Sequence, residues 1–138
     1  MDKDITVAAA VIIEGNRILA AQRGHGELAG GWEFPGGKVE ANETPVEACI
    51  REVNEEIGVV IRDLEPFVSL EYEYPSFHMH LDTFTCTIAE GTPQITEHRD
   101  LRWLSGDELD SVAWLPADIQ VVNALKAYLA NSGSFTAH

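Results

Sequence analysis

Hydrophobic residues form short runs along the first two thirds of the chain, and these runs predict β-strands. Residues 7–13 and 18–22 are rich in Val, Ile and Ala and are joined through Glu14-Gly15-Asn16, a pattern typical of a hairpin. A third extended segment, Trp32-Glu33-Phe34, is interrupted by Pro35-Gly36-Gly37. Further strands are predicted over residues 59–61, 67–74, 79–88 and 101–104.

The segment from Thr44 to Gly58 has the signals of an α-helix at both ends. Thr44 is a good N-cap, Pro45 suits the first helical position, and Glu47 completes a capping box. Gly58 stands where a glycine ends a helix. The spacing predicts a core stripe made of Val46, Ile50, Val53 and Ile57.

A second helix is predicted over residues 119–129, with Ile119, Val122, Leu125 and Leu129 on one stripe. The small, polar residues that follow, 132–138, predict a disordered tail. At 138 residues and 45% hydrophobic content, one domain over residues 1–131 is expected. Strands mixed with two helices predict the α+β class, with helices packed on a mixed sheet.

The charge of the chain is strongly acidic, at −14 from 23 Asp and Glu against 9 Lys and Arg. This balance excludes indiscriminate binding to duplex nucleic acid, which depends on Lys and Arg neutralising phosphates. The start lacks a basic signal region and no apolar run reaches about 20 residues, so neither export nor a membrane span is expected. Cys49 and Cys86 are expected to be buried, reduced thiols, and the protein to be cytoplasmic.

Three carboxylates of the first helix, those of Glu52, Glu55 and Glu56, share an arc rotated away from the core stripe. A solvated acidic face is one interpretation, and a site for a hard cation such as Mg²⁺ is the other. Upstream, the glycines of Phe34-Pro35-Gly36-Gly37-Lys38 allow the backbone to approach a metal or phosphate closely, although a simple turn explains them equally well. The spacing alone does not decide between an acidic face and a cation site, or between a turn and a close approach of the backbone to a ligand.

Taken together, these residues resemble the signature of the Nudix hydrolases, G-x5-E-x7-R-E-U-x-E-E-x-G-U, where U is a bulky aliphatic residue. The chain matches every specified position, with Gly37, Glu43, Arg51-Glu52-Val53, Glu55-Glu56 and Gly58-Val59. Segments outside the signature, such as 70–75 and 114–119, are similar to the MutT branch, which includes CTP pyrophosphohydrolases. The resemblance implies a Nudix-type α/β/α sandwich with a mixed β-sheet between helices.

The resemblance also implies an activity, the Mg²⁺-dependent conversion of a nucleoside triphosphate to the monophosphate and pyrophosphate, with Mn²⁺ as a substitute. By resemblance, the Gly36 carbonyl, Glu52, Glu55, Glu56 and Glu97 hold the metal ions. Glu52 or a neighbour such as Glu55 activates water, Arg51 orients the glutamates, and Glu43 is structural. Glu97 could equally be a solvated loop residue, and His98 beside it is expected at the surface.

The substrate-binding residues implied by the resemblance are Arg23, Glu33, Phe34, Gly36, Gly37, Lys38 and Asp118. Asp118 could instead cap the last helix, and Phe34 could simply pack in the core. Phe77 stands where the MutT pattern has an arginine, so 8-oxo-dGTP and cytidine triphosphates both remain open as substrates. A carboxylate accepts hydrogen bonds only, so an Asp118 that reads both the donor and the acceptor of cytosine has to be protonated.

Two alternatives to this activity stay open. Within the family, ADP-ribose or a dinucleoside polyphosphate is an alternative substrate, and a non-catalytic nucleotide- or metal-binding module is the alternative from another class. The expected partner is a nucleoside triphosphate, with no nucleic acid polymer and no membrane. The protein is expected to be a monomer or a weak homodimer.

Overall fold

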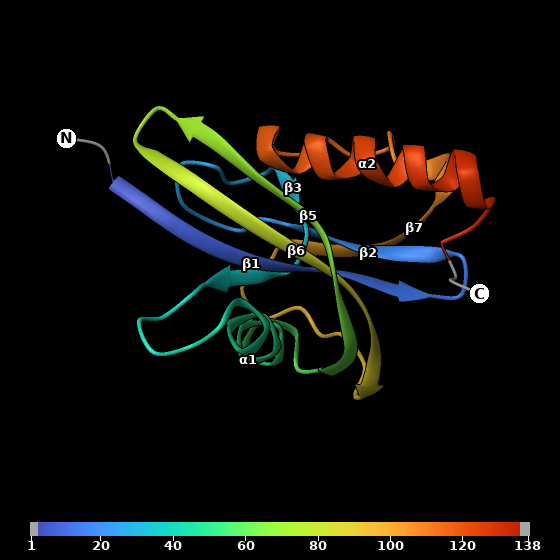
Figure 1. Ribbon diagram of the computed structural model, residues 1–138, viewed down its shortest axis with the longest axis horizontal. Helices are drawn as coiled ribbons and strands as arrows, with labels where there is room; N and C mark the ends of the chain where they lie inside the picture. Colours follow the sequence, from blue (N-terminus) through green and yellow to red (C-terminus); the bar gives the residue numbers. More distant parts are fainter. Residues whose placement is uncertain (1–2, 136–138) are drawn as a thin grey trace.

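The computed structural model, which describes residues 3–135, places a seven-stranded mixed sheet between two α-helices (Figure 1). The helix α1 lies on one face of the sheet and α2 on the other (Figure 1). This arrangement confirms the predicted α+β sandwich. In chain order the elements are β1 (Lys3–Glu14), β2 (Arg17–Gln22), β3 (Trp32–Glu33), β4 (Gly36–Lys38), α1 (Pro45–Ile57), β5 (Val60–Tyr74), β6 (Phe77–Glu90), β7 (Asp100–Ser105), the 3₁₀ helix η1 (Gly106–Glu108) and α2 (Pro116–Ser132).

Strand β1 organises the sheet, because it pairs with three other strands. It forms the predicted hairpin with β2, runs parallel to β6 from Lys3 to Ile12, and pairs antiparallel with β4. The strand order is β3-β2-β1-β6-β5, with β7 also paired to β2. The Pro35-Gly36-Gly37 segment therefore does not leave the sheet, since Ala9 and Ala8 of β1 pair with its two glycines.

Helix α1 forms as its sequence signals predict. The Thr44 side chain accepts a hydrogen bond from the Glu47 N–H, the Glu47 carboxylate accepts from the Thr44 N–H, and Gly58 ends the helix with φ 75°. Cys49, Val53 and Ile57 are buried against the sheet. Val46 departs from the predicted stripe, with 38% of its surface exposed, because it lies in the first turn, before the part of the helix that is packed.

Helix α2 is longer than the predicted 119–129 range, and its buried face differs. Val121, Val122 and Leu125 are buried, whereas Ile119 is 45% exposed. The start of the predicted tail also differs, because α2 continues to Ser132 and Phe135 is only 1% exposed. Burying an aromatic ring stabilises a segment that its small, polar neighbours would leave disordered. The rest of the predicted tail, 136–138, lies outside the described residues.

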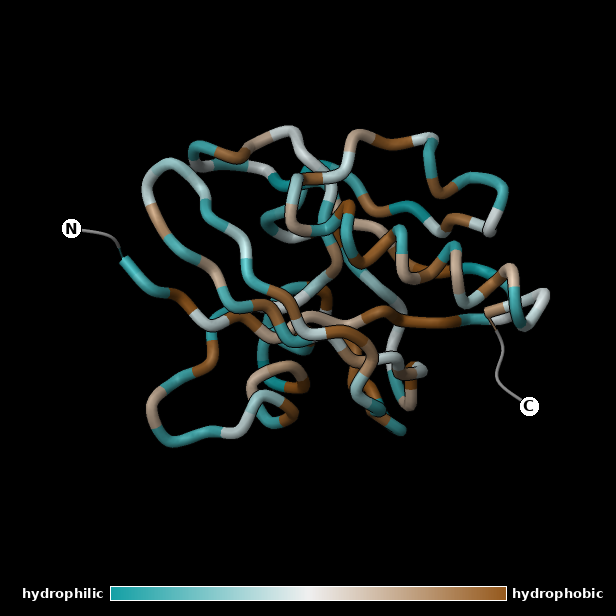
Figure 2. Tube along the Cα trace, turned by 45° about the horizontal axis from the view of Figure 1, so that its top comes forward, coloured by the Kyte–Doolittle hydropathy of each residue, from teal (hydrophilic) through white to brown (hydrophobic). Residues whose placement is uncertain are grey.

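The sheet separates two apolar clusters, one under each helix. Val11, Ile18 and Leu81 pack with α2, whereas Ala10, Ile12 and Phe84 pack with α1. Figure 2 shows the hydrophobic colour concentrated along the central strands and the inner side of α2. Both clusters draw on β1, because its successive side chains point to opposite faces of the sheet.

Strand β5 is continuous where the sequence predicted two separate strands. Irregularities between Val60 and Ile61, between Arg62 and Glu65, and between Pro66 and Ser69 shift its pairing with β6. Asp63 stands inside the second irregularity with φ 59°, a conformation in which Asp is tolerated better than most residues. Such bulges let a polar stretch interrupt the alternation without ending the strand.

Both cysteines are buried and free, as predicted. Burial raises the pKa of the Cys49 thiol to about 12 and raises the pKa of Cys86 further. Both thiols therefore stay protonated at neutral pH. No helix within residues 3–135 has the length and apolar character needed to cross a membrane.

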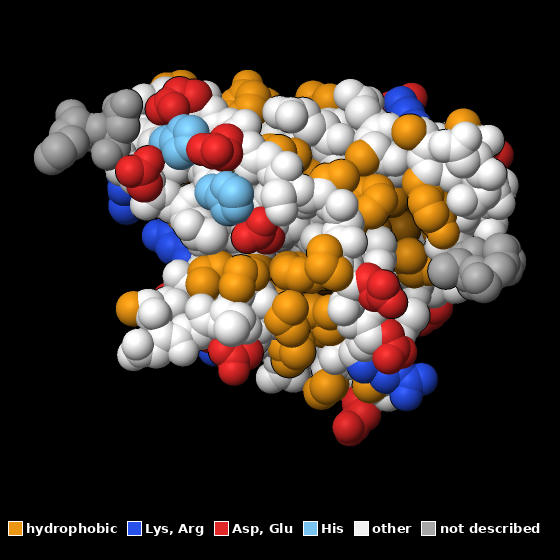
Figure 3. Space-filling view, viewed as in Figure 1, with side chains coloured by type: hydrophobic (Ala, Val, Ile, Leu, Met, Phe, Trp, Pro, Cys, Tyr) orange, Lys and Arg blue, Asp and Glu red, His pale blue; other side chains and the backbone are white. Residues whose placement is uncertain are grey.

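The outer part of the β5–β6 hairpin carries histidines among acidic side chains, seen at the upper left in Figure 3. The two ring nitrogens of His78 lie 2.8 Å from Glu73 and 2.6 Å from Glu71. These two contacts hold the pKa of His78 above its usual value. His80 has a single acidic contact in this group, 3.1 Å from Asp82.

We expect His78→Gln to lower the stability of the protein at acidic pH and to leave it unchanged at high pH. The charged imidazole stabilises the folded state fully below its unfolded pKa of about 6.5, and this contribution is lost as pH rises through the raised folded pKa. In urea unfolding across this pH range, wild type should have the higher free energy of unfolding at low pH, and the values of the two proteins should become equal at high pH. Added salt should reduce this difference in stability. A difference that persists at high pH would show that it does not come from the charged His78.

Candidate active site

The predicted substrate-binding residues gather around one cavity of about 200 Å³, here called the central cavity. It opens between α1 and α2, at the end of the sheet where β3 and β4 meet β1 and β2. Every predicted substrate-binding residue lines it, together with Glu56 from the acidic face of α1. The lining residues are Ile5, Val7, Arg23, Leu28, Glu33, Phe34, Gly36, Gly37, Lys38, Glu56, Tyr74, Phe77, Met79, Leu115 and Asp118.

The two glycines of β4 bring the backbone against the carboxylates of α1. The Gly36 N–H donates to the Glu56 carboxylate at 3.2 Å. A Cβ added to Gly37 would overlap the carboxyl group of Glu52. The turn interpretation of Gly-Gly is therefore incomplete, because only a residue without a side chain leaves room for Glu52 at this place.

Arg51 holds the neighbouring carboxylates in place from one side of α1. Its guanidinium donates to Glu43 at 2.6 and 3.0 Å, and to Glu52 and Glu55 at 3.2 Å each. It also donates to the Lys38 carbonyl at 3.1 Å, which ties α1 to the end of β4. This geometry fits the orienting role expected for Arg51 and the structural role expected for Glu43.

The carboxylates of α1 differ in their electrostatic environment. Burial raises the pKa of Glu56 to about 7, although the nearby charge of His98 and the Gly36 N–H pull it down. Burial also raises the pKa of Glu52, opposed by its hydrogen bond from Arg51. Glu55 is different, since 58% of its side chain is exposed. The acidic face is thus partly enclosed rather than simply solvated.

Gly36 and Glu56 line the central cavity, whereas the other predicted metal ligands, Glu52, Glu55 and Glu97, do not. Glu97 is the most exposed of these three. Its side chain is 80% exposed and lies 3.9 Å from His25. Within residues 3–135, no three His, Cys, Asp or Glu side chains converge on one point as a preformed metal site. Glu52 and Glu55 are instead held by Arg51, while Glu56 is held by Gly36.

Asp118 is a buried acid in the lining of the central cavity. Helix α2 begins at Pro116, so Asp118 lies inside its first turn and is not the N-cap. The residue is 7% exposed, and its carboxyl group accepts a hydrogen bond from the Phe34 N–H at 3.2 Å. Burial raises the pKa of Asp118 well above its usual value, with the charge of Glu33 adding to the effect.

Phe34 lies both in the packed core and in the wall of the central cavity. It is 3% exposed and its ring stacks on Trp114 with centroids 4.7 Å apart, and the same residue lines the central cavity. Tyr74 lies nearby, its hydroxyl accepting from the Ala117 N–H at 3.1 Å. The wall of the cavity around Phe34 is therefore aromatic and buried, which suits a planar ring.

Basic side chains also line the central cavity and the hollow beside it, in a chain that has few of them. Arg23 and Lys38 line the central cavity, and a shallower hollow beside it is lined by both of them and by Lys3. Lys3 was not predicted from the sequence, because a lysine near a chain end has no distinguishing signal. Three of the nine basic residues thus face one opening, which favours an anionic ligand there.

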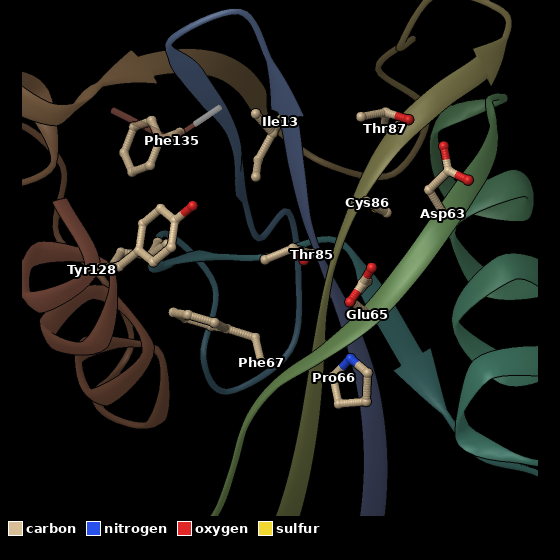
Figure 4. Close-up of a pocket in the computed structure, with 11 residues that line it drawn as sticks. Ile13, Asp63, Glu65, Pro66, Phe67, Thr85, Cys86, Thr87, Tyr128 and Phe135 are labelled. Carbon is tan, nitrogen blue, oxygen red and sulfur yellow. The ribbon is translucent and has the colours of Figure 1, made fainter. Parts of the chain in front are cut away.

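A second, larger cavity of about 480 Å³ lies away from these residues, between α2 and β5 (Figure 4). Phe67, Tyr128 and Phe135 form one side of it, and Asp63 and Glu65 on β5 lie at the other (Figure 4). Among the described residues, no Lys or Arg lines it. Because phosphate binding needs positive charge or metal ligands, the central cavity is the better candidate for an active site.

His98 was predicted wrongly from the sequence. It was expected at the surface, yet it is 8% exposed and lies 3.5 Å from the Glu33 carboxylate, behind the wall of the central cavity. A histidine in a polar loop gives no local signal of burial. Its position depends on how the loop before β7 folds back over the end of β2, where the Arg99 N–H donates to the Gln22 carbonyl.

Comparison with known proteins identifies the family of the chain. The model of the NUDIX domain matches residues 3–126. The chain is 38% identical to the CTP pyrophosphohydrolase of Escherichia coli over 93% of this chain and 96% of that protein. It is 35% identical to the 8-oxo-dGTP diphosphatase of the same organism, over 90% and 98%.

Among solved structures, the protein resembles the MutT protein of methicillin-resistant Staphylococcus aureus, described as a Nudix hydrolase. The TM-score is 0.74, at 42% identity, over 93% of this chain and 99% of that one. Both the sequence match and the structural match therefore extend over nearly the whole chain, including the β4 glycines and α1. The chain belongs to the NUDIX domain family.

Proposed function

We propose that the protein is a MutT-type pyrophosphohydrolase, which hydrolyses a nucleoside triphosphate to the nucleoside monophosphate and pyrophosphate. The observation that carries this proposal is the layout of the central cavity. Asp118 and Phe34 line it with buried groups suited to a base, Arg23 and Lys38 line it with positive charge suited to phosphates, and Glu56 of α1 lines the same cavity. The relatives named as CTP pyrophosphohydrolase and 8-oxo-dGTP diphosphatase support the same reaction.

The metal expected for this reaction is Mg²⁺, with Mn²⁺ as a substitute. Glu52 and Glu56 fit a hard divalent cation, because both supply carboxylate oxygens beside the β4 glycines that leave space for them. The Gly36 carbonyl and Glu55 are proposed to complete this set, with Glu97 contributing only if its loop moves inward. When bound, such an ion neutralises phosphate charge and makes an attacking water easier to deprotonate.

The chain's own residues have separate tasks in this mechanism. Glu52 is proposed to accept the proton of the attacking water, and Arg51 orients Glu52 through the hydrogen bond described above. Lys38 and Arg23 neutralise charge on the triphosphate, which offsets a chain charge of −14 that would otherwise repel it. Water adds to one phosphorus of the phosphoanhydride between the α- and β-phosphates while giving a proton to Glu52, the bond from that phosphorus to the bridging oxygen breaks, and the bridging oxygen leaves with the other product.

Asp118 supplies a physical basis for the choice of base. A carboxyl group whose pKa is raised by burial is protonated more readily, and it then offers one donor beside one acceptor. Cytosine presents the complementary pair, an amino donor next to a ring acceptor. The oxidised edge of 8-oxoguanine presents N7–H beside O6, whereas unmodified guanine has two acceptors there. Both cytidine and 8-oxoguanine triphosphates therefore fit a protonated Asp118.

We also propose how the chain is organised, where it works and how it assembles. Residues 1–131 are proposed to act as one domain, because the central cavity uses residues from Ile5 to Asp118. The protein is proposed to work in the cytoplasm as a monomer or weak homodimer. Removal of oxidised or modified nucleotides from the precursor pool is the role that this chemistry fits.

A pyrophosphate-release assay tests the proposal directly. The purified protein with Mg²⁺ should release pyrophosphate from at least one of 8-oxo-dGTP, CTP and 5-substituted dCTP, and more slowly from dGTP. The same panel with Mn²⁺, and with the metal chelated, identifies the cation. Cleavage of ADP-ribose or a dinucleoside polyphosphate, with no cleavage of these triphosphates, would replace the proposal with another Nudix activity.

We expect Asp118→Asn to change which base is preferred. Asn offers a fixed amide donor and acceptor, whereas Asp118 gains its donor only when protonated, so the variant should lose the pH dependence of base choice. At a pH where the Asp118 carboxyl of wild type is ionised and offers acceptors only, the ratio of kcat/KM for CTP over dGTP should be about 10-fold higher in the variant, because the amide supplies the donor that the ring acceptor of cytosine needs. Asp110→Asn, on an exposed residue paired with Lys126, is the matched control. An unchanged ratio would remove Asp118 from base recognition.

A further inference from the structure

His98 is a buried histidine with an incomplete set of hydrogen bonds. Its side chain is only 5% exposed, and its Nδ1 atom is a buried polar atom with no partner within the described residues. A buried group left without a partner costs free energy, so its presence calls for an explanation. The other ring nitrogen, Nε2, supplies this explanation, because it faces Glu33 in the wall of the central cavity.

The backbone around His98 is fixed against the strand end that carries Arg23. The Arg99 N–H donates to the Gln22 carbonyl at 2.9 Å. A Cβ on Gly24 would overlap the Glu97 carbonyl oxygen, so these two segments are in direct contact. His98 is therefore held at a set distance from the site rather than on a loose loop.

Glu33 lies between two nitrogen groups. One of its oxygens is 3.5 Å from His98 Nε2, and its carboxylate also accepts from Arg23 Nη1 at 3.2 and 3.4 Å. The Glu33 side chain is 17% exposed, whereas that of Arg23 is 44% exposed. Arg23 thus depends for its orientation on a carboxylate that His98 contacts from the buried side.

We propose that His98 is a positioning residue, which fixes Glu33 and through it turns the Arg23 guanidinium toward the phosphates of the substrate. This inference rests on the proposed function, because the task of Arg23 is to hold a nucleotide. It assigns His98 no contact with the substrate. Positioning of Glu33 requires Nε2 of the ring and does not require Nδ1, which has no partner within the described residues.

Three substitutions separate the two nitrogens. In His98→Gln the amide nitrogen stands the same number of bonds from Cβ as Nε2, so the donor to Glu33 is retained. In His98→Asn it stands where Nδ1 was, so that donor is lost, and in His98→Leu no polar group remains. A residue that merely fills space would tolerate Leu at least as well as Gln.

Steady-state kinetics on the best triphosphate from the substrate panel provides the test. Well above pH 7, where Glu56 is ionised with or without the charge of His98, we expect His98→Asn and His98→Leu to raise KM by about 10-fold, the loss of one charge-assisted contact, with kcat within about threefold of wild type. His98→Gln should restore KM to within about threefold. Equal defects in Gln and Leu, or a loss of kcat with KM unchanged, would overturn the proposal.

A double-mutant cycle with Arg23→Ala tests the pathway through Glu33. If His98 acts through Arg23, adding His98→Asn to Arg23→Ala should leave KM unchanged, whereas independent effects would multiply. Thermal unfolding of each variant checks folding. Should Leu unfold the protein, the comparison of Gln with Asn still decides the question.

Failure of the proposed function has a separate signature, namely a wild-type protein that cleaves no triphosphate. In that case crystal structures of His98→Gln and His98→Asn test the positioning alone. The Arg23 to Glu33 hydrogen bond should be present in the Gln variant and absent or rearranged in the Asn variant. An unchanged Arg23 in the Asn variant would overturn the inference.

Discussion

Replacing Glu56 with Gln is expected to lower kcat by about 10³-fold, because a carboxylate that holds a metal on a phosphate contributes several kcal/mol to the transition state. The amide has the same shape and keeps an oxygen that can accept from the Gly36 N–H, so the fold should be retained. Pyrophosphate release under saturating substrate and Mg²⁺ measures the effect. A kcat close to that of wild type would show that Glu56 is not a ligand.

The stability of the same variant gives an independent check. Because burial raises the pKa of Glu56 to about 7, the folded state favours its protonated form. The stability of the metal-free protein should therefore fall as pH rises from the ordinary glutamate value toward 7, and Glu56→Gln should remove that fall. Urea unfolding of wild type and Glu56→Gln, measured in chelator across this pH range, tests whether stability falls as pH rises.

Glu47→Gln on the same helix is the matched control for Glu56→Gln. Glu47 is exposed and closes the capping box with Thr44, a task that Gln performs almost as well. The control removes the same charge from α1 without touching the central cavity. Normal kcat in Glu47→Gln and a large loss in Glu56→Gln would place the effect at the site rather than in the overall charge of the helix.

The second large effect is expected from Gly37→Ala, which should lower kcat by about 10²-fold, since misplacing a reacting group by about 1 Å is enough for a loss of this size. The added methyl group would overlap the Glu52 carboxyl group and force that flexible side chain to move. Because only the end of a side chain has to shift, the loss of stability should be small. Activity and thermal unfolding measured on one preparation separate these effects.

Gly106→Ala is the matched control for Gly37→Ala. A Cβ at Gly106 meets Leu129 Cδ1 at 2.9 Å, also a movable side-chain end, but outside the lining of the central cavity. Both changes add one methyl group against one side chain. If Gly37→Ala keeps full activity, Glu52 takes no part in the reaction as proposed, and the close approach of β4 to α1 is only a packing feature.

The acidity of the chain takes on a more specific meaning in the folded protein. Three of its nine basic residues line the central cavity or the hollow beside it, and the Glu56 carboxylate of α1 lines the central cavity as well. A phosphate ligand therefore meets local positive charge despite the overall charge of −14. This distribution fits a small anionic substrate that arrives with a divalent cation better than it fits a polyanion, which would contact the acidic surface as well.

Local features of the fold were predictable from the sequence. The caps of α1 and the hairpin of β1 and β2 involve residues within a few positions of one another. Capping, turn geometry and helical periodicity act over that range, so the residues themselves specify α1, the hairpin and the α+β class. The acidic face that marks the family belongs with them, because its carboxylates lie on one helix at a fixed rotation.

Positions that depend on distant segments needed the folded chain. Contacts between remote parts of the sequence place Asp118 against Phe34 rather than at the cap of α2, and bury His98 behind Glu33. The same holds for Glu97, which points to solvent although its neighbour is buried. The burial and charge of such side chains are set by segments that approach from elsewhere in the chain, and no pattern of neighbouring residues records that approach.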